Sequence, residues 1–106
     1  MAEIPDNIIQ IIKRFIDYLE KADMHIQQAI LYGSYANGRY NEYSDIDLAL
    51  VSDKFSGSRF YDLDKLRDAR FAVSTDIAPM PYRPEDFIPD NLFVKEILKT
   101  GINIEL

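Results

Sequence analysis

The sequence predicts an α/β fold of the α+β kind, in which a small, mixed, twisted β-sheet carries helices on one face. Two observations predict it: apolar residues at helical spacing open the chain and recur near its end, and short strand-like apolar runs lie between them. A chain of 106 residues is the size of one domain and can bury about 60 to 70 per cent of its unfolded surface. We therefore expect residues 1–106 to form a single domain.

The first predicted element is an amphipathic helix that starts at Pro5 or Asp6 and ends within residues 21–23. Ile8, Ile12 and Phe15 repeat at a spacing of three and four residues, which places them on one helical face. A first strand is expected over residues 27–32. His25, the only histidine, precedes that strand at the end remote from the later motif, so we expect it to be structural.

A second strand is expected over residues 45–52, followed by a turn-rich connection and a helix that starts at Ser58 or Asp62 and runs to about Arg70. The charged side of this helix is expected to be solvated, and it comprises Asp62, Asp64, Lys65, Arg67 and Asp68. Residues 71–78 then predict a third strand with Asp76 near its centre. Two prolines at positions 79 and 81 are expected to end that strand.

The end of the chain predicts a helix over residues 91–100 with Asp90 as its cap, and a short strand over residues 102–106. The formal net charge of −6 argues against a broad nucleic-acid surface, because phosphate binding depends on lysine and arginine. The sequence contains no membrane-length apolar run and no export signal, so we expect a cytoplasmic protein. Cysteine is absent, which excludes disulfides and thiolate metal sites.

Two aspartates, Asp45 and Asp47, open the second strand. Alternate side chains of a strand share a face, so these carboxylates project together while Ile46 and Leu48 point into the core. At a separation of roughly 5 Å their repulsion is on the order of 3 kcal/mol, which water, a proton or a cation would relieve. Mg²⁺ suits such a site because it prefers oxygen ligands. A solvated turn and strand is the alternative reading of this pair.

A Gly-Ser turn precedes the aspartates, with ten residues between Ser34 and Asp45. Gly33 permits the sharp turn from strand to helix, Ser34 is expected to cap the short helix that follows, and Gly38 to end it. The free N–H groups of such a turn can hold a phosphate.

The combination of Gly33-Ser34, the spacer and Ser44-Asp45-Ile46-Asp47 resembles the polymerase-beta-type nucleotidyltransferase superfamily, in particular its minimal nucleotidyltransferase (MNT) domains. The resemblance implies transfer of a nucleoside monophosphate, with AMP from ATP as the expected donor. It also implies a third acidic residue on a neighbouring strand, for which Asp76 is the candidate.

In the site that the resemblance implies, Asp45, Asp47 and Asp76 hold two Mg²⁺ ions, while Gly33 and Ser34 hold the phosphates. Asp76 is then also the candidate base. Asn37 departs from the family pattern, because many relatives carry a basic residue there.

Minimal nucleotidyltransferases lack the acceptor domain of larger relatives. The resemblance therefore implies a partner chain, a small helical toxin of the HEPN type whose tyrosine receives AMP, with this chain as the antitoxin. A small-molecule nucleotidyltransferase of the aminoglycoside-modifying kind, working as a homo-oligomer, is one alternative. An antitoxin that only occludes its partner is the other.

Overall fold

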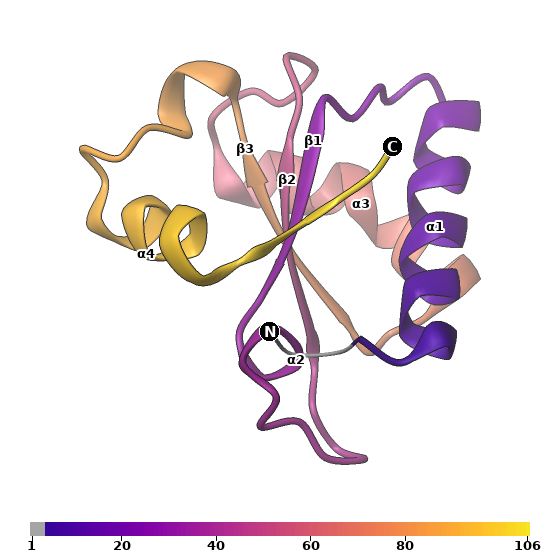
Figure 1. Ribbon diagram of the computed structural model, residues 1–106. Helices are drawn as coiled ribbons and strands as arrows, with labels where there is room; N and C mark the ends of the chain where they lie inside the picture. Colours follow the sequence, from indigo (N-terminus) through magenta and orange to yellow (C-terminus); the bar gives the residue numbers. More distant parts are fainter. Residues whose placement is uncertain (1–3) are drawn as a thin grey trace.

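A four-stranded sheet lies between helices in the computed structural model, which describes residues 4–106 (Figure 1). The elements follow the chain in the order α1 (Asp6–Lys21), β1 (Gln28–Tyr32), α2 (Ser34–Asn37), β2 (Ile46–Val51), α3 (Arg59–Val73), β3 (Ile77–Tyr82), the 3-10 helix η1 (Pro84–Asp86), α4 (Leu92–Thr100) and β4 (Ile102–Ile104). Over this described range, no helix has the length and apolar character needed to cross a membrane.

The strands are arranged in the order β3-β2-β1-β4. β1 runs antiparallel to both β2 and β4, whereas β2 and β3 are parallel, so the predicted mixed sheet is confirmed. The pairing places Tyr32 of β1 opposite Asp47 of β2, and Asp47 opposite Ala78 of β3. These three residues form one row across the sheet.

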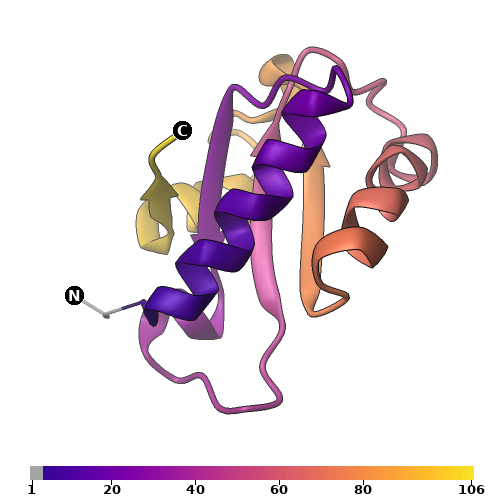
Figure 2. The same ribbon diagram turned by 90° about the vertical axis from the view of Figure 1, so that its right-hand side faces the viewer.

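One face of the sheet carries the main hydrophobic core, under α1 and α3 (Figure 2). Ile12 and Phe15 of α1 are completely buried, as the helical spacing predicted, and they belong to the same cluster as Leu31, Leu48 and Leu66. Fully burying one such side chain contributes roughly 1.5 to 3 kcal/mol, so this face supplies much of the stability.

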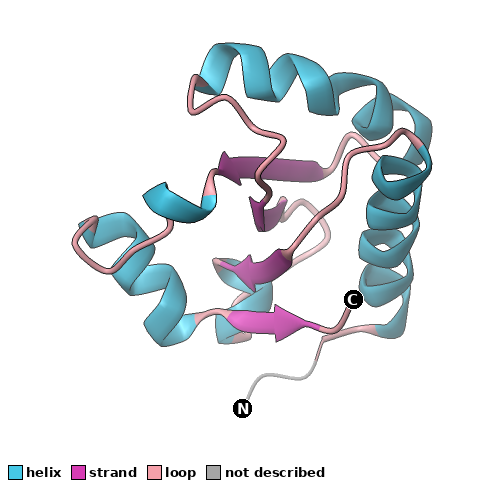
Figure 3. Cartoon of the chain, turned by 90° about the horizontal axis from the view of Figure 1, so that it is seen from above, coloured by secondary structure: helices cyan, strands magenta, loops and turns pink. Residues whose placement is uncertain are grey.

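The other face of the sheet carries α4, which lies on the side opposite to α1 (Figure 3). Val94 and Ile97 of α4 pack against Ile30, Ala49 and Val51. The predicted arrangement with helices on one face therefore holds for α1 and α3 but not for α4. The reason is visible in the strands: a run such as Leu48 to Val51 is apolar at every position, which is typical of strands covered on both faces.

The third strand lies later in the chain than predicted, because α3 continues to Val73 and β3 spans Ile77–Tyr82 with both prolines inside it. β3 is an edge strand. Its bonds to β2 come from even-numbered residues, since the Asp76 carbonyl accepts from Ile46 N–H at 2.8 Å and the Tyr82 carbonyl from Ser52 N–H at 3.0 Å. Pro79 and Pro81 fall at the alternate positions, whose nitrogens face the free edge, where no N–H is needed.

The connection from β2 to α3 is anchored by Asp62, a residue predicted to be solvated. Asp62 is only 1% exposed. Its carboxylate accepts hydrogen bonds from Ser56 N–H at 2.7 Å, the Ser56 hydroxyl at 3.0 Å and Gly57 N–H at 3.0 Å. The predicted polar face of α3 is wrong at this position, because the carboxylate replaces water with backbone donors of the loop that folds over it.

Helix α4 begins one residue later than predicted, with Asn91 rather than Asp90 as its cap. The Asn91 side-chain oxygen accepts hydrogen bonds from Phe93 N–H at 2.9 Å and Val94 N–H at 3.3 Å. An asparagine in this position satisfies N–H groups that the first helical turn leaves without a partner.

Candidate functional site

The Gly-Ser turn lies directly against the carboxylate of Asp47. Gly33 has φ 75° and so occupies the left-handed region that glycine tolerates best. A methyl group at this position would collide with the carboxylate of Asp47, its carbon lying 3.1 Å from Asp47 Cγ. The structure therefore brings Gly33 and Asp47 together, although thirteen residues of the chain separate them.

The short helix α2 is capped differently from the prediction. Gly33 occupies the cap position and makes its bonds through its carbonyl, which accepts from Ala36 N–H at 3.0 Å and Asn37 N–H at 3.1 Å. Ser34 is the first helical residue and makes no capping bond with its side chain. The hydroxyl of Ser34 and the N–H groups at the start of α2 are thereby left for another ligand, beside Asp47.

Asp45 and Asp47 lie on one face at the start of β2, as the alternation of the strand predicted. Ile46 and Leu48 are buried on the opposite face. Burial of the half-buried Asp47 side chain raises its pKa, and the negative charge of Asp45 raises it further. The predicted mutual repulsion of the two carboxylates is thus present in the folded chain.

Asp76 lies in the turn before β3 rather than in the middle of a strand, and it is exposed. Because Ile46 pairs with Ile77, Asp76 lies level with Asp45, whereas the residue opposite Asp47 is Ala78. Nowhere in residues 4–106 do three acidic, histidine or cysteine side chains form a group that could hold a single metal ion. The structure therefore joins Asp45 with Asp47 and leaves Asp76 at the rim; its catalytic role stays a prediction.

Tyr32 is a site residue whose position the sequence did not reveal. It ends β1 opposite Asp47, and its ring contacts Phe93 of α4 edge-on at 5.8 Å between centroids. Burial raises the pKa of Tyr32 to about 12, and the nearby Asp47 and Tyr82 raise it as well. The Tyr32 hydroxyl thus stays protonated and available to donate a hydrogen bond beside the carboxylates.

Other tyrosines near the motif differ in burial: Tyr35 belongs to the main hydrophobic core, with 7% of the residue exposed, whereas Tyr40 and Tyr43 are exposed. Tyr35 and Tyr40 stack on each other, with 4.7 Å between their ring centroids. Tyr43 is 87% exposed in the loop before β2. The structural reading of His25 also fits, because its Nδ1 lies 3.0 Å from Glu20 on α1.

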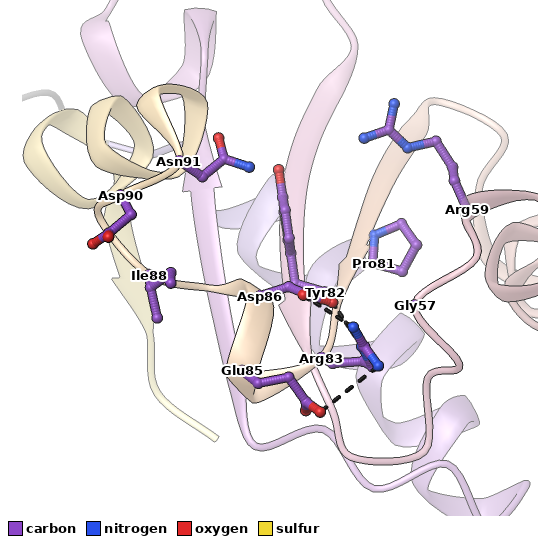
Figure 4. Close-up of a pocket in the computed structure, with 10 residues that line it drawn as sticks. All are labelled: Gly57, Arg59, Pro81, Tyr82, Arg83, Glu85, Asp86, Ile88, Asp90 and Asn91. Carbon is purple, nitrogen blue, oxygen red and sulfur yellow. Dashed lines mark hydrogen bonds and ion pairs between the residues drawn. The ribbon is translucent and has the colours of Figure 1, made fainter.

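A cavity of about 480 Å³ opens between the start of α3, the end of β3 and the connection to α4 (Figure 4), at the end of β3 where Tyr82 pairs with Val51. Arg59, Tyr82 and Asn91 are among its lining residues. Arg83 lines its floor and is held by Asp86 at 2.7 Å and by Glu85 at 3.7 Å. This cavity could not be predicted from the sequence, because its residues come from three separate segments.

A second cavity, of about 300 Å³, lies between the Gly-Ser turn and α4. Its lining includes Tyr32, Gly33, Asn37 and Phe93. The second cavity therefore borders Gly33, which contacts Asp47, whereas the first cavity lies at the end of β3.

Comparison with known proteins agrees with this geometry. The family model of the nucleotidyltransferase domain matches residues 10–103. A protein of Methanocaldococcus jannaschii, named a "putative protein adenylyltransferase", is 49% identical over 43 residues, which are 40% of this chain and 43% of that protein. The match thus spans less than half the length of that relative.

A crystal structure with a similar fold comes from Sulfolobus solfataricus, where it is described as a "putative nucleotidyltransferase". It matches with a TM-score of 0.67 over 92% of this chain and 78% of its own. The two sequences are 14% identical, so this likeness concerns the fold.

Proposed function

Because the chain belongs to the nucleotidyltransferase domain family, we propose that it transfers AMP from ATP to the hydroxyl of a tyrosine on another protein. The observation that carries this proposal is the contact between Gly33 and the Asp47 carboxylate, with Asp45 beside it. A turn with free N–H groups next to paired carboxylates suits a nucleotide whose phosphates arrive with a cation.

Asp45 and Asp47 are the residues that would hold Mg²⁺. They fit this ion because both provide oxygen ligands and because a positive charge would offset the burial of Asp47 and its repulsion by Asp45, which together raise the pKa of Asp47. When bound, Mg²⁺ supplies Lewis-acid polarisation of phosphate oxygens. Whether one or two ions bind, Asp45 and Asp47 are the common ligands in this proposal.

The chain's own groups position the reactants. Ser34 and the N–H groups at the start of α2 bind the phosphate tail of ATP. The acceptor hydroxyl oxygen forms a bond to the α-phosphorus, the bond from that phosphorus to the bridging oxygen breaks, and pyrophosphate leaves with that oxygen. Asp76 keeps the proposed role of accepting the hydroxyl proton, because the sheet register sets it level with Asp45.

The proposed acceptor is a tyrosine of a small helical toxin of the HEPN type, for which this chain would serve as the antitoxin. The similarity to a protein named as an adenylyltransferase of proteins supports this class of acceptor, over 43 residues. The net charge of −6 favours association with a basic partner.

The test is the mass of the partner after incubation with this chain, Mg²⁺ and ATP. We expect the intact mass of the partner to increase by one AMP group on a tyrosine. Asp47→Asn and Asp45→Asn should abolish the increase, because each removes a ligand charge for the cation. Asp53→Asn is the matched control, since Asp53 is an exposed aspartate after the far end of β2, and it should transfer AMP like the unmodified chain.

Full transfer by Asp47→Asn would contradict the carboxylate site. Transfer to a small hydroxyl compound but to no protein would contradict the proposed protein acceptor and would still support nucleotidyl transfer.

A further inference from the structure

Arg59 lies at the edge of the cavity described above and has no ionic partner among residues 4–106. The other arginines of α3 and its surroundings are engaged: Arg67 pairs with Asp64 at 2.9 Å, Arg70 donates to the Ile77 carbonyl at 2.7 Å, and Arg83 pairs with Asp86 at 2.7 Å. Arg59 makes no salt bridge to any residue in 4–106, and it is exposed.

Two further groups face the same space as Arg59 (Figure 4). The ring of Tyr82 is largely buried, with 8% of the residue exposed, and its hydroxyl points to the open side of the cavity. The Asn91 side chain uses its oxygen to cap α4, so its nitrogen is the atom left to face Tyr82. Arginine and amide nitrogens are donors only, and the tyrosine hydroxyl can also donate.

The acidic residues around this cavity do not neutralise Arg59. Glu85 and Asp86 both turn to Arg83, and Asp90 points away from Arg59 toward the outer side of the connection (Figure 4). The positive charge of Arg59 reaches the interior of the site, because it lowers the pKa of Tyr82 and of Tyr32 against the larger effect of burial. A donor-rich wall with an uncompensated guanidinium suits a planar or tetrahedral oxyanion.

The place of this cavity in the sheet indicates which reactant it meets. The Gly-Ser turn follows β1, Asp47 lies on β2, and the cavity lies at the end of β3, the next strand of the sheet. Tyr32 connects the two places, because it pairs with Asp47 and its pKa is raised by Asp47 and lowered by Arg59. In phosphoryl-type transfer the attacking and leaving oxygens lie roughly in line with the phosphorus between them. If the pyrophosphate leaves beside the turn at β1, the acceptor enters from the side of β3.

We infer that Arg59, together with Tyr82 and Asn91, forms a subsite for an anionic group of the acceptor, a carboxylate or phosphate that neighbours the hydroxyl to be modified. This inference rests on the proposed function and adds the class of acceptor: a tyrosine flanked by an acidic residue. Arg59 acts here as an acceptor-positioning residue, and it takes no part in the transfer itself.

Binding can be measured without turnover by NMR of the ¹⁵N-labelled chain, following the Nε–Hε signal of Arg59. The probes are two blocked dipeptides, acetyl-glutamyl-tyrosine amide and acetyl-lysyl-tyrosine amide. We expect a saturable shift with the glutamyl peptide and binding about tenfold to a hundredfold weaker with the lysyl peptide, the range expected for a hydrogen bond to a charged group. Equal binding of both peptides, or no shift of Arg59, overturns the inference.

Charge reversal gives the sharper test. Arg59→Glu should invert the preference in favour of the lysyl peptide. Arg67→Glu, on the same helix but turned away from this cavity and paired with Asp64, carries the same change in charge and should keep the preference for the glutamyl peptide. A structural defect alone would weaken the binding of both peptides alike. An inverted preference in Arg59→Glu therefore supports a direct contact between residue 59 and the charged side chain of the peptide.

The anion could instead belong to the nucleotide, and a titration with Mg²⁺ and ATP distinguishes the two sources. We expect Arg59→Gln to bind ATP with unchanged affinity. A tenfold loss of ATP affinity in this variant overturns the assignment to the acceptor. If the peptides bind as expected but the unmodified chain transfers no AMP to any tyrosine, the proposed function fails while the anionic subsite stands.

Discussion

Asp47 is the residue at which the candidate site lowers the stability of the fold at neutral pH. It is half-buried beside Asp45, and both effects raise its pKa. The unfolded chain therefore ionises this group at lower pH than the folded chain does. The contribution of Asp47 to stability is complete below the usual aspartate pKa of about 3.9, and it is lost as the pH rises through the raised value.

We expect Asp47→Asn to be more stable than the unmodified chain at pH 7, and the difference to shrink as the pH falls toward about 3.5. The gain should be below about 1 kcal/mol, because solvent screens a half-buried carboxylate. Urea unfolding of both proteins at the two pH values measures it. Mg²⁺ should stabilise the unmodified chain and leave the variant unchanged; a variant less stable at pH 7 would contradict this account.

At the scale of an element, the loop between β2 and α3 depends on one buried side chain. Asp62 accepts three hydrogen bonds from Ser56 and Gly57, and it orders the segment that leads to Arg59. We expect Asp62→Ala to lower the free energy of unfolding by about 2 to 3 kcal/mol, because two N–H groups and a hydroxyl lose a charged acceptor.

The control for Asp62→Ala is Asp64→Ala, which removes an exposed pair with Arg67 on the same helix and should cost less than about 1 kcal/mol. Denaturant unfolding compares the two variants, and hydrogen exchange of residues 53–58 should quicken only in the first. Similar losses in both would mean that Asp62 does not hold the loop.

The helices and strands also show which parts of the fold could be predicted from the sequence. The spacing of Ile8, Ile12 and Phe15 predicted α1, and the alternation around Asp45 and Asp47 predicted which face the carboxylates occupy; both are local properties of the chain. The path of β3 is not local. Prolines normally end a strand, and only the position of β3 at the sheet edge, with its free nitrogens outward, permits two of them.

The same limit applies to the site. Gly33 and Asp47 could be placed together because a recognisable spacing joins them. Arg59 and Tyr82 could not, because the first begins a helix and the second ends a strand, and only the packing of α3 beside β3 lets them line one cavity. The position of Asp76 beside Asp45, rather than beside Asp47, likewise follows from the register between the parallel strands β2 and β3.

At the scale of the whole molecule, the two faces of the sheet have different tasks. The face under α1 and α3 holds the larger core. The opposite face is covered by α4 over only part of its area, and the row of Tyr32, Asp47 and Ala78 stays partly exposed. A stable core on one side thus supports an open, polar site on the other.

If the proposed partner exists, this chain could silence it by AMP transfer or by occlusion, and we expect transfer. The physical reason is that occlusion gains nothing from two carboxylates that repel each other, whereas a cation that binds together with the phosphates needs their oxygens. A partner modified by transfer should stay inactive after this chain is removed, and Asp47→Ala should fail to protect cells even at high abundance. Purifying the partner away from this chain and measuring its mass and activity decides the matter: an unmodified partner that regains full activity would favour occlusion.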